Sequence, residues 1–249
     1  MNDKSITIAT PFFNEEEGLE NFFNVLKKID LMIGKKIETK YLFIDDGSTD
    51  QTKRKLIEFK EKNTNFNIQI YSHKKNIGYG RTLKNSIKLA DTNYLVTYDA
   101  DCTYNFNHIE TLISKIISEN QDIINISYKL SNKKMNLSLF RRILSWGGSA
   151  IYEFIFPEVR NYNIKVFTCS FRIYNLEKIK EIEIISDDYN ATAELVIKAM
   201  KQKLKIIEIP GENVGRKFGN SKMKIIKNIF NTLKTIFLIK KNNLINYKK

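Results

Sequence analysis

The chain has 249 residues, a formal net charge of +13 and two cysteines. This length is enough for one large α/β domain with a sizeable core. Cys102 and Cys169 show neither a disulfide framework nor metal-ligand spacing, which fits a reducing compartment. No signal peptide begins the sequence, and no apolar stretch approaches the roughly 18 uncharged residues of a membrane span. We therefore expect a cytoplasmic protein without a transmembrane helix.

The positive charge lies in the second half of the chain. Residues 1–127 contain 17 Lys and Arg against 18 Asp and Glu, whereas residues 128–249 contain 24 against 10. From Asn213 to Lys249 there are ten basic residues and no acidic one. This asymmetry predicts an anionic partner, such as nucleic acid, anionic lipid or a phosphorylated substrate. The alternative is that the lysines only cover solvated faces of a Lys-rich, Asn-rich and Ile-rich chain.

Strand and helix patterns alternate through residue 127, which is typical of βαβ units in a mostly parallel α/β sheet. The expected strands are Ile6–Thr10, Tyr41–Ile44, Asn67–Tyr71, Tyr94–Thr97 and Ile123–Ser127. Apolar residues at helical spacing predict the intervening helices. These are Glu16–Ile29 with Asn14 as N-cap, Thr52–Lys62, Arg81–Ala90 and His108–Ile117.

The alternation breaks after residue 127. The expected elements there are a basic loop at Ser131–Asn136, a helix at Leu137–Phe156, a strand at Thr168–Tyr174, a helix at Ala191–Lys203 and a strand at Leu204–Ile209. Ser221–Lys241 then predicts a basic amphipathic helix with one apolar side. That side either covers the sheet or lies in a membrane interface.

Two acidic loops each follow an apolar run that predicts a buried strand. One contains Asp45, Asp46 and Asp50, and the other contains Asp99 and Asp101. In an open parallel sheet, ligands bind outside the carboxyl ends of the strands. Bare carboxylates there would repel a diphosphate, whereas Mg²⁺ or Mn²⁺ bound to them would attract it. A helix cap would explain Asp50, but it would not explain the other carboxylates.

The first expected βα turn, from Thr10 to Glu17, is not rich in glycine. It contains neither G-x-G-x-x-G nor G-x-x-x-x-G-K-[ST], so a dehydrogenase or P-loop phosphate cradle has no support there. Its acidic residues can accept hydrogen bonds from a base or a ribose. They can also simply complement a helix N-terminus.

Seven short motifs stand in a fixed order along the chain. They are Pro11–Glu15, Asp45–Asp50, Asn76–Gly78, Asp99–Asp101, Arg141–Ser145, Thr168–Tyr174 and Arg216–Lys222. In these motifs and their order the chain resembles family 2 glycosyltransferases, over roughly residues 5–240. The second-half motifs are similar to those of dolichol-phosphate mannose synthase and the bacterial polyprenyl-phosphate glycosyltransferases. Two departures from the pattern are Cys102–Asn105 after the Asp-x-Asp sequence and Val166 in place of an Asp.

The resemblance implies a GT-A fold, with a Rossmann-like, mostly parallel sheet in one domain over residues 1–249. Residues 1–127 would bind the nucleotide sugar and residues 128–249 the acceptor. The implied activity is that of an inverting, metal-dependent hexosyltransferase with a GDP-mannose or UDP-glucose type of donor and Mg²⁺ or Mn²⁺. The leading acceptor is a polyprenyl phosphate at the cytoplasmic membrane face, where the protein would be peripheral on an anionic surface. The alternative is a saccharide hydroxyl in cell-surface polysaccharide or lipopolysaccharide assembly.

The same resemblance assigns roles to individual residues. The donor-binding residues would be Pro11, Asn14, Glu15, Asp45, Asp46, Asn76, Gly78 and Asp99, with Asp99 and Asp101 holding the metal. The acceptor or donor phosphates would be bound by Arg141, Arg142, Ser170, Arg172, Arg216, Ser221 and Lys222. The catalytic residues would be Asp99, Asp101, Arg172 and Glu194. A nucleic-acid partner is not expected, because the sequence has no RNP or helix-turn-helix signature.

The acceptor decides how the nucleophile is activated. A phosphate monoester is mostly dianionic at neutral pH and needs cations rather than a base, whereas a sugar hydroxyl needs a carboxylate base. The candidate bases are Asp187, Asp188 and Glu194. Arg172 stands on an otherwise apolar strand, and a buried guanidinium without a partner is costly. We therefore expect an anion at Arg172, either a bound phosphate or a structural carboxylate.

Overall fold

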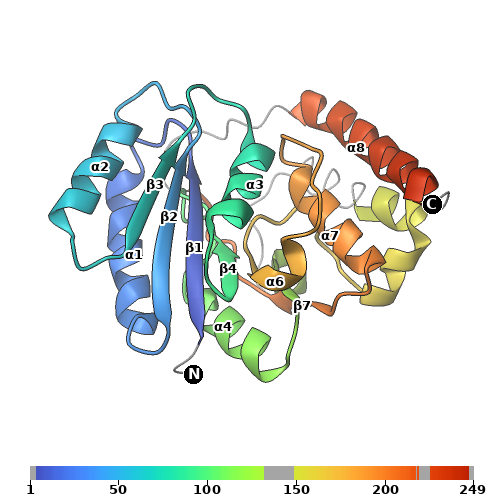
Figure 1. The fold of residues 1–249 in the computed structure, drawn as a ribbon, viewed down its shortest axis with the longest axis horizontal. Coiled ribbons are helices and arrows are strands. Elements are labelled where there is room, and N and C mark those ends of the chain that lie inside the picture. The colour runs from blue at the N-terminus through green and yellow to red at the C-terminus, as the bar shows by residue number, and fades with distance from the viewer. Residues whose placement is uncertain (1–3, 132–148, 217, 219–224, 247–249) are drawn as a thin grey trace.

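The computed structural model describes residues 4–131, 149–216, 218 and 225–246, and Figure 1 shows their arrangement. The described residues form a seven-stranded sheet in the order β3-β2-β1-β4-β6-β5-β7. The strands are β1 (Ser5–Phe12), β2 (Glu38–Asp45), β3 (Ile68–Ser72), β4 (Tyr94–Thr97), β5 (Ile123–Ser127), β6 (Arg172–Asn175) and β7 (Ile206–Pro210). This sheet and its flanking helices confirm the expected α/β fold.

The pairing of the strands places the loops that follow four of them at one edge of the sheet. β1 is parallel to β2 and β4, and β2 is parallel to β3, so the carboxyl ends of these four strands lie at the top of Figure 1. β6 is antiparallel to both β4 and β5, between which it lies. Because β6 comes from the second half of the chain, the two halves on either side of residue 127 share one sheet.

Helices cover both faces of the sheet. The helices are α1 (Leu19–Ile33), α2 (Thr52–Lys62), α3 (Tyr79–Leu89), α4 (His108–Ser118), α6 (Leu176–Ile179), α7 (Ala191–Lys201) and α8 (Ile225–Asn246). The apolar faces of α1, α2 and α4 pack in one core cluster, and those of α3, α6, α7 and α8 pack in another. Alternate strand residues such as Ile8 and Ala9 point to opposite clusters.

Most expected elements are present, with shifted bounds. The strand expected from Thr168 begins only at Arg172, and the first helix begins at Leu19 rather than Glu16. The expected N-cap role of Asn14 is wrong, because Gly18 precedes the helix and Asn14 has a φ of +52° in the loop before it. Of the helix expected before Phe156, residues 149–155 are helical and residues 137–148 lie outside the described residues. Within the described part of the chain, every helix is too short or too polar to cross a membrane.

Candidate functional site

Two acidic loops lie at the same edge of the sheet, on either side of β1. Asp45 is the last residue of β2 and Asp46 follows it, while Asp99 and Asp101 follow β4. β1 pairs with both strands, and its Pro11 is in register with the end of β2. The strand order thus brings together the carboxylates that were singled out from the sequence.

The loop after β1 is fastened to the loop after β2. The Asn14 N–H donates to Ser48 Oγ at 2.9 Å, and Asn14 Oδ1 accepts the Thr49 N–H at 2.8 Å. The Glu15 N–H donates to Thr52 Oγ1, also at 2.8 Å. These bonds join the two loops into one unit, with Asn14 positioning the backbone of the second loop.

Asp46 uses both of its carboxylate oxygens inside the protein. Oδ1 accepts the Ile77 N–H at 3.0 Å and lies 2.7 Å from His73 Nδ1, and Oδ2 accepts the Gly78 N–H at 2.9 Å. Asp45 is only 1% exposed and accepts a backbone N–H of its own loop at 3.1 Å. Contact of either side chain with a base or ribose stays a prediction. Their observed task is to shape the loops around the site.

Gly78 stands where two backbones approach each other. Its φ is +105°, and a Cβ atom on it would lie 2.4 Å from the Asp187 carbonyl oxygen. Gly78 thereby allows the loop held by Asp46 to contact the segment before α7. The expected role of Gly78 in donor binding is therefore accompanied by a structural requirement for glycine.

The substitution Gly78→Ala is expected to destabilise the protein more than Gly215→Ala. Both glycines have a positive φ, at +105° and +77°, which costs a non-glycine residue on the order of 1–3 kcal/mol. Of the two, only the methyl group at Gly78 would also overlap backbone atoms of Asp187. This overlap adds roughly 1–3 kcal/mol to the loss of stability. Chemical denaturation of both variants measures the difference. Equal losses would show that the contact with Asp187 yields at little cost.

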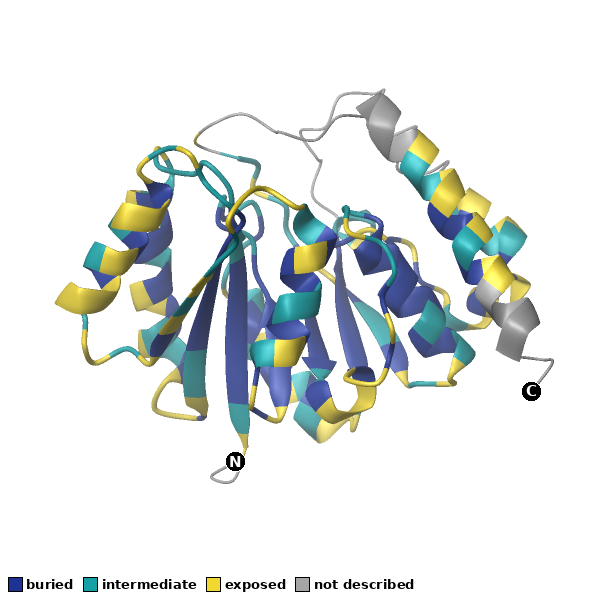
Figure 2. Ribbon diagram, turned by 45° about the horizontal axis from the view of Figure 1, so that its top comes forward, coloured by how far each residue is buried: buried dark blue, intermediate teal, exposed yellow. Residues whose placement is uncertain are grey.

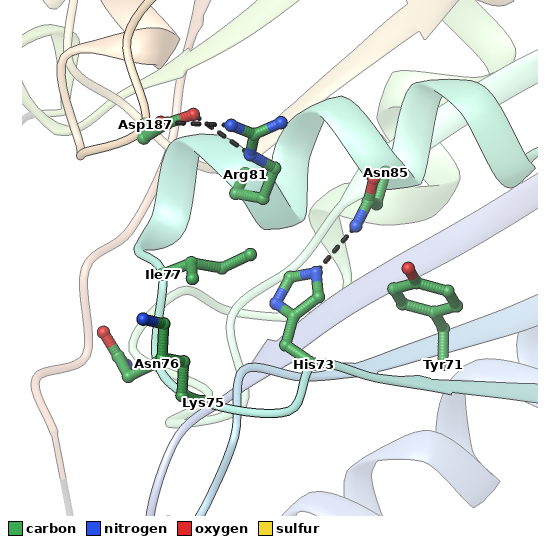
Figure 3. Close-up of a pocket in the computed structure, with 8 residues that line it drawn as sticks. All are labelled: Tyr71, His73, Lys75, Asn76, Ile77, Arg81, Asn85 and Asp187. Carbon is green, nitrogen blue, oxygen red and sulfur yellow. Dashed lines mark hydrogen bonds and ion pairs between the residues drawn. The ribbon is translucent and has the colours of Figure 1, made fainter.

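A pocket of about 570 Å³ opens between β3 and α3, beside the loop that Asp46 holds (Figure 3). Polar partners already join its side chains, since His73 Nε2 lies 2.6 Å from Asn85 Nδ2 and Arg81 pairs with Asp187 at 3.1 Å. The pocket includes Asn76 from the expected donor site but not the aspartates after β2 and β4. It is lined by Tyr71, His73, Lys75, Asn76, Ile77, Arg81, Asn85 and Asp187.

Arg216 joins the two acidic sides of the site. Its guanidinium forms an ion pair with Glu15, and Nη1 lies 3.7 Å from Asp101 Oδ2. The segment that carries it pairs with the loop after β4, where the Val214 N–H donates to the Thr103 carbonyl at 2.8 Å. Burial opposes the charge of Arg216, yet Glu15 and then Asp101 raise its pKa. Arg216 therefore remains a cation between the carboxylates of Glu15 and Asp101.

Asp99 is the most perturbed carboxyl group of the site. Burial, and after it the Asp101 carboxylate, raise the pKa of Asp99 to about 7, although Ser170 lowers it by donating its hydroxyl to Oδ2. Ser170 itself is 2% exposed, so it supports Asp99 from within the core. Near neutral pH the pair of aspartates is thus stabilised by a proton or by a cation.

The two aspartates fit part of a divalent cation site. Mg²⁺ is commonly held by one or two carboxylates, with phosphate and water oxygens completing the coordination. Within the described residues, no group of three or more His, Cys, Asp and Glu side chains is placed to hold a metal. Asp99 and Asp101 would therefore share the ion with the oxygens of a ligand.

The structure corrects the expectation for Arg172. Its side chain is 0% exposed and has neutral oxygens as partners: Nε donates to Asn125 Oδ1 at 2.8 Å and Nη1 to the Thr192 carbonyl at 2.7 Å. Nη2 donates to the Phe167 carbonyl at 2.5 Å. The expectation of an anion at Arg172 is wrong, because backbone and amide oxygens satisfy the guanidinium. The observed role is to fasten the start of β6 to β5, to α7 and to the segment around Phe167.

The structure also corrects the expectation that Glu194 is a free catalytic base. Glu194 is 1% exposed, and its two carboxylate oxygens accept the Ile185 and Ser186 N–H groups at 2.8 and 2.9 Å. Lys198 pairs with it at 2.7 Å. Burial raises the pKa of Glu194, but Lys198 and the two N–H groups outweigh burial, so the pKa is lowered. A carboxylate in this state holds a loop and is a poor proton acceptor.

The Glu194→Gln variant is expected to lose about 1.5–3 kcal/mol of stability at pH 7, the usual contribution of hydrogen bonds to a charged group. Because the folded-state pKa is lowered, the advantage of the wild type is complete above the unfolded value of about 4.3. It disappears as the pH falls through the folded value. Urea denaturation from neutral to acidic pH measures this, with the exposed Glu61→Gln as control. A difference that stayed constant into acid would contradict an ionised Glu194.

Two tyrosines beside Asp99 were missed in the sequence. Tyr79 opens α3 and Tyr189 precedes α7, and their ring centroids are 4.9 Å apart. Burial and then the Asp99 carboxylate raise the pKa of both hydroxyls, and Tyr189 also bonds with Ser170. The two residues are far apart in the chain, so no local motif could indicate them.

Four of the expected phosphate-binding residues lie outside the described residues. They are Arg141, Arg142, Ser221 and Lys222.

A comparison with protein families finds a match over residues 7–183 to the family described as Glycosyl transferase family 2. A processive diacylglycerol beta-glycosyltransferase of Mycoplasma genitalium is 32% identical over 122 residues, which are 49% of this chain and 34% of the relative. A dolichyl-phosphate beta-glucosyltransferase of Dictyostelium discoideum is 25% identical over 219 residues, which are 82% of this chain and 64% of the relative. The chain thus spans about a third of the first of these proteins and somewhat under two thirds of the second.

Solved structures share the fold. Glucosyl-3-phosphoglycerate synthase from Mycobacterium tuberculosis, in complex with Mn²⁺, UDP-glucose and phosphoglyceric acid, matches with a TM-score of 0.69 at 14% identity. The match covers 95% of this chain and 79% of that one. At this identity the likeness supports the three-dimensional arrangement alone.

Proposed function

The chain belongs to glycosyl transferase family 2, and on this basis we propose that it transfers a hexose from a nucleoside-diphosphate sugar to a polyprenyl phosphate. The donor is of the UDP-glucose or GDP-mannose type, and the anomeric centre is inverted. The dolichyl-phosphate beta-glucosyltransferase among the relatives supports a lipid-phosphate acceptor. Such an acceptor lies in a membrane, and our proposal places the transfer at the inner face of that membrane.

The acceptor assignment depends on one observation: each of the three candidate bases already has a partner inside the protein. Asp187 is paired with Arg81 and Lys84, and Glu194 is buried against backbone N–H groups. Asp188 accepts the N–H of Asn190 at 2.8 Å before α7. A sugar hydroxyl would need one of these groups as a free base. A phosphate monoester needs none, because its second pKa is near 6 and it is already mostly dianionic.

The two halves of the chain would bind different substrates. Residues 1–127 would bind the donor, with Pro11, Asn14 and Glu15 bounding the nucleoside pocket. Residues 128–249 would bind the acceptor, and Arg216 reaches from that half into the donor side.

Attack by an acceptor phosphate oxygen on the anomeric carbon forms the new glycosidic bond as the bond to the nucleoside diphosphate breaks. Negative charge then grows on the leaving diphosphate. Arg216 would exchange its ion pair with Glu15 for these oxygens, and Ser170 would keep Asp99 oriented. A divalent cation held by Asp99 and Asp101 would neutralise the same charge.

The test measures transfer from radiolabelled UDP-glucose and GDP-mannose, with Mn²⁺ or Mg²⁺, to undecaprenyl phosphate. Diacylglycerol and a panel of saccharides serve as the competing acceptors. We expect a product only with the lipid phosphate, and NMR of that product should show inversion. Transfer to a saccharide hydroxyl or to diacylglycerol instead would overturn the acceptor assignment, and a retained configuration would overturn the single displacement.

A further inference from the structure

Helix α8 turns large apolar side chains toward solvent. Phe230, Leu233 and Phe237 are 69%, 52% and 65% exposed. On the other side of the helix, Ile236 and Ile239 are buried in the core cluster of α3 and α7. The helix is therefore already anchored by one face, and its apolar outer face has no protein cover among the described residues (Figure 2).

Lysines flank this outer face on both sides. At about 100° per residue, Phe230, Leu233 and Phe237 fall within one narrow stripe, with Lys234 and Lys241 along one border and Lys240 along the other. All three lysines are exposed, and no acidic residue occurs from residue 213 to residue 249. An apolar stripe bordered by lysines is typical of a helix that lies in the interface of an anionic membrane.

The exposed apolar side chains of α8 form one group rather than isolated positions. Single exposed apolar residues need no explanation, but three large ones along one stripe of a helix indicate a contact surface. We call Phe230, Leu233 and Phe237, with Lys234, Lys240 and Lys241, the docking face.

We propose that the docking face binds an anionic lipid membrane, with the phenyl rings inserted among the acyl chains and the lysines at the headgroup phosphates. Charge complementarity selects this occupant, since a second copy of the chain would bring lysines against lysines. The inference rests on the proposed function in one respect. That function explains why the protein would bind a membrane, because the acceptor lies there.

The docking face is coupled to the candidate site. Thr232 Oγ1 donates to Asn190 Oδ1 at 2.8 Å, and Thr235 Oγ1 lies 2.9 Å from Ser186 Oγ. These bonds tie the inner side of α8 to the segment that carries Tyr189, whose hydroxyl bonds with Ser170, the partner of Asp99. A membrane on the outer side would thus lie about one helix diameter, roughly 10–12 Å, from this segment, so a lipid phosphate would need little displacement from the headgroup layer.

Vesicle flotation of the full chain, without donor or polyprenyl phosphate, tests the proposal. We expect binding to vesicles that contain phosphatidylglycerol, weaker binding to pure phosphatidylcholine, and release by salt. The double variant Phe230→Ser/Phe237→Ser should bind at least about tenfold more weakly. Its matched control is Leu31→Ser, which changes a 78% exposed apolar side chain of α1. The triple variant Lys234→Gln/Lys240→Gln/Lys241→Gln should lose about fivefold per lysine, unlike Lys53→Gln/Lys60→Gln/Lys62→Gln on α2.

Three results would overturn the proposal. They are undiminished binding by the phenylalanine variant, an equal loss in the Leu31 control, and a wild-type dimer that the phenylalanine variant converts to a monomer. Besides vesicle binding, the experiment measures transfer to a short-chain, water-soluble polyprenyl phosphate. The Phe230→Ser/Phe237→Ser variant should perform this transfer at the wild-type rate. No transfer by any variant, together with normal vesicle binding, would refute the proposed reaction and leave the docking face intact.

Discussion

The Asp99→Asn variant is expected to lose transfer activity by about a thousandfold while becoming more stable. The loss follows because the neutral amide neither binds a hard cation well nor helps to balance the charge that grows on the leaving diphosphate. The gain follows because burial and Asp101 raise the pKa of Asp99 to about 7. Ionisation of this carboxyl therefore costs stability in the folded state as the pH rises from its unfolded value of about 3.9 toward 7. An asparagine removes that cost and can still accept the Ser170 hydroxyl.

Two measurements check this expectation. The rate of donor turnover measures the loss of transfer activity. Chemical denaturation without divalent cations, at acidic and at slightly alkaline pH, measures the free energy of unfolding. The stability advantage of the variant should appear only at the higher pH. Asp91→Asn serves as the control, because Asp91 forms an exposed ion pair with Lys40 and stands before β4, at the opposite edge of the sheet. An inactive Asp99→Asn protein that was also less stable would indicate a folding defect rather than a lost catalytic group.

The sequence predicted the position of the acidic loops well, because that position depends only on strand order and direction. Alternating apolar runs identified β1, β2 and β4, and parallel strands must end at one edge. Asp45, Asp46, Asp99 and Asp101 therefore lie at the same edge, on either side of β1. The antiparallel insertion of β6 between β4 and β5 was not predictable in this way, because no local pattern encodes which strands pair across long separations.

Individual side chains were harder to predict, because a residue type does not reveal its partner. Arg172 and Glu194 are charged residues in apolar surroundings, and such a pattern fits a catalytic group and a structural one equally well. In the structure both have partners inside the protein: backbone carbonyls and the Asn125 amide oxygen at Arg172, and backbone N–H groups and Lys198 at Glu194. Buried charges are stabilised by any well-placed dipoles, and backbone dipoles leave no trace in the sequence.

Arg216 differs from Arg172 because its partners are carboxylates of the site itself. Replacement of Arg216 by alanine is expected to reduce kcat/KM for the donor by about 10–150-fold, which corresponds to the roughly 1.5–3 kcal/mol of a charged hydrogen bond. Arg216→Lys should recover only part of this loss, because lysine keeps the charge but lacks the planar fork that matches two phosphate oxygens. Steady-state kinetics with varied donor measure both effects, and calorimetry with UDP shows whether binding accounts for them.

The matched control for Arg216 is Arg54→Ala, which removes an exposed arginine paired with Glu58 on α2 and should leave kcat/KM unchanged. A second comparison separates a contact with the donor from a structural link between the two halves. If Arg216 only connected Glu15 to the loop of Asp101, Arg216→Ala would weaken the binding of a nucleoside and of its diphosphate alike, because the loss of that link would disturb the whole pocket. If Arg216 acts on the diphosphate, Arg216→Ala should weaken the binding of the diphosphate and leave the binding of the nucleoside unchanged. Equal losses for the two ligands would therefore contradict a role of Arg216 in neutralising the leaving group.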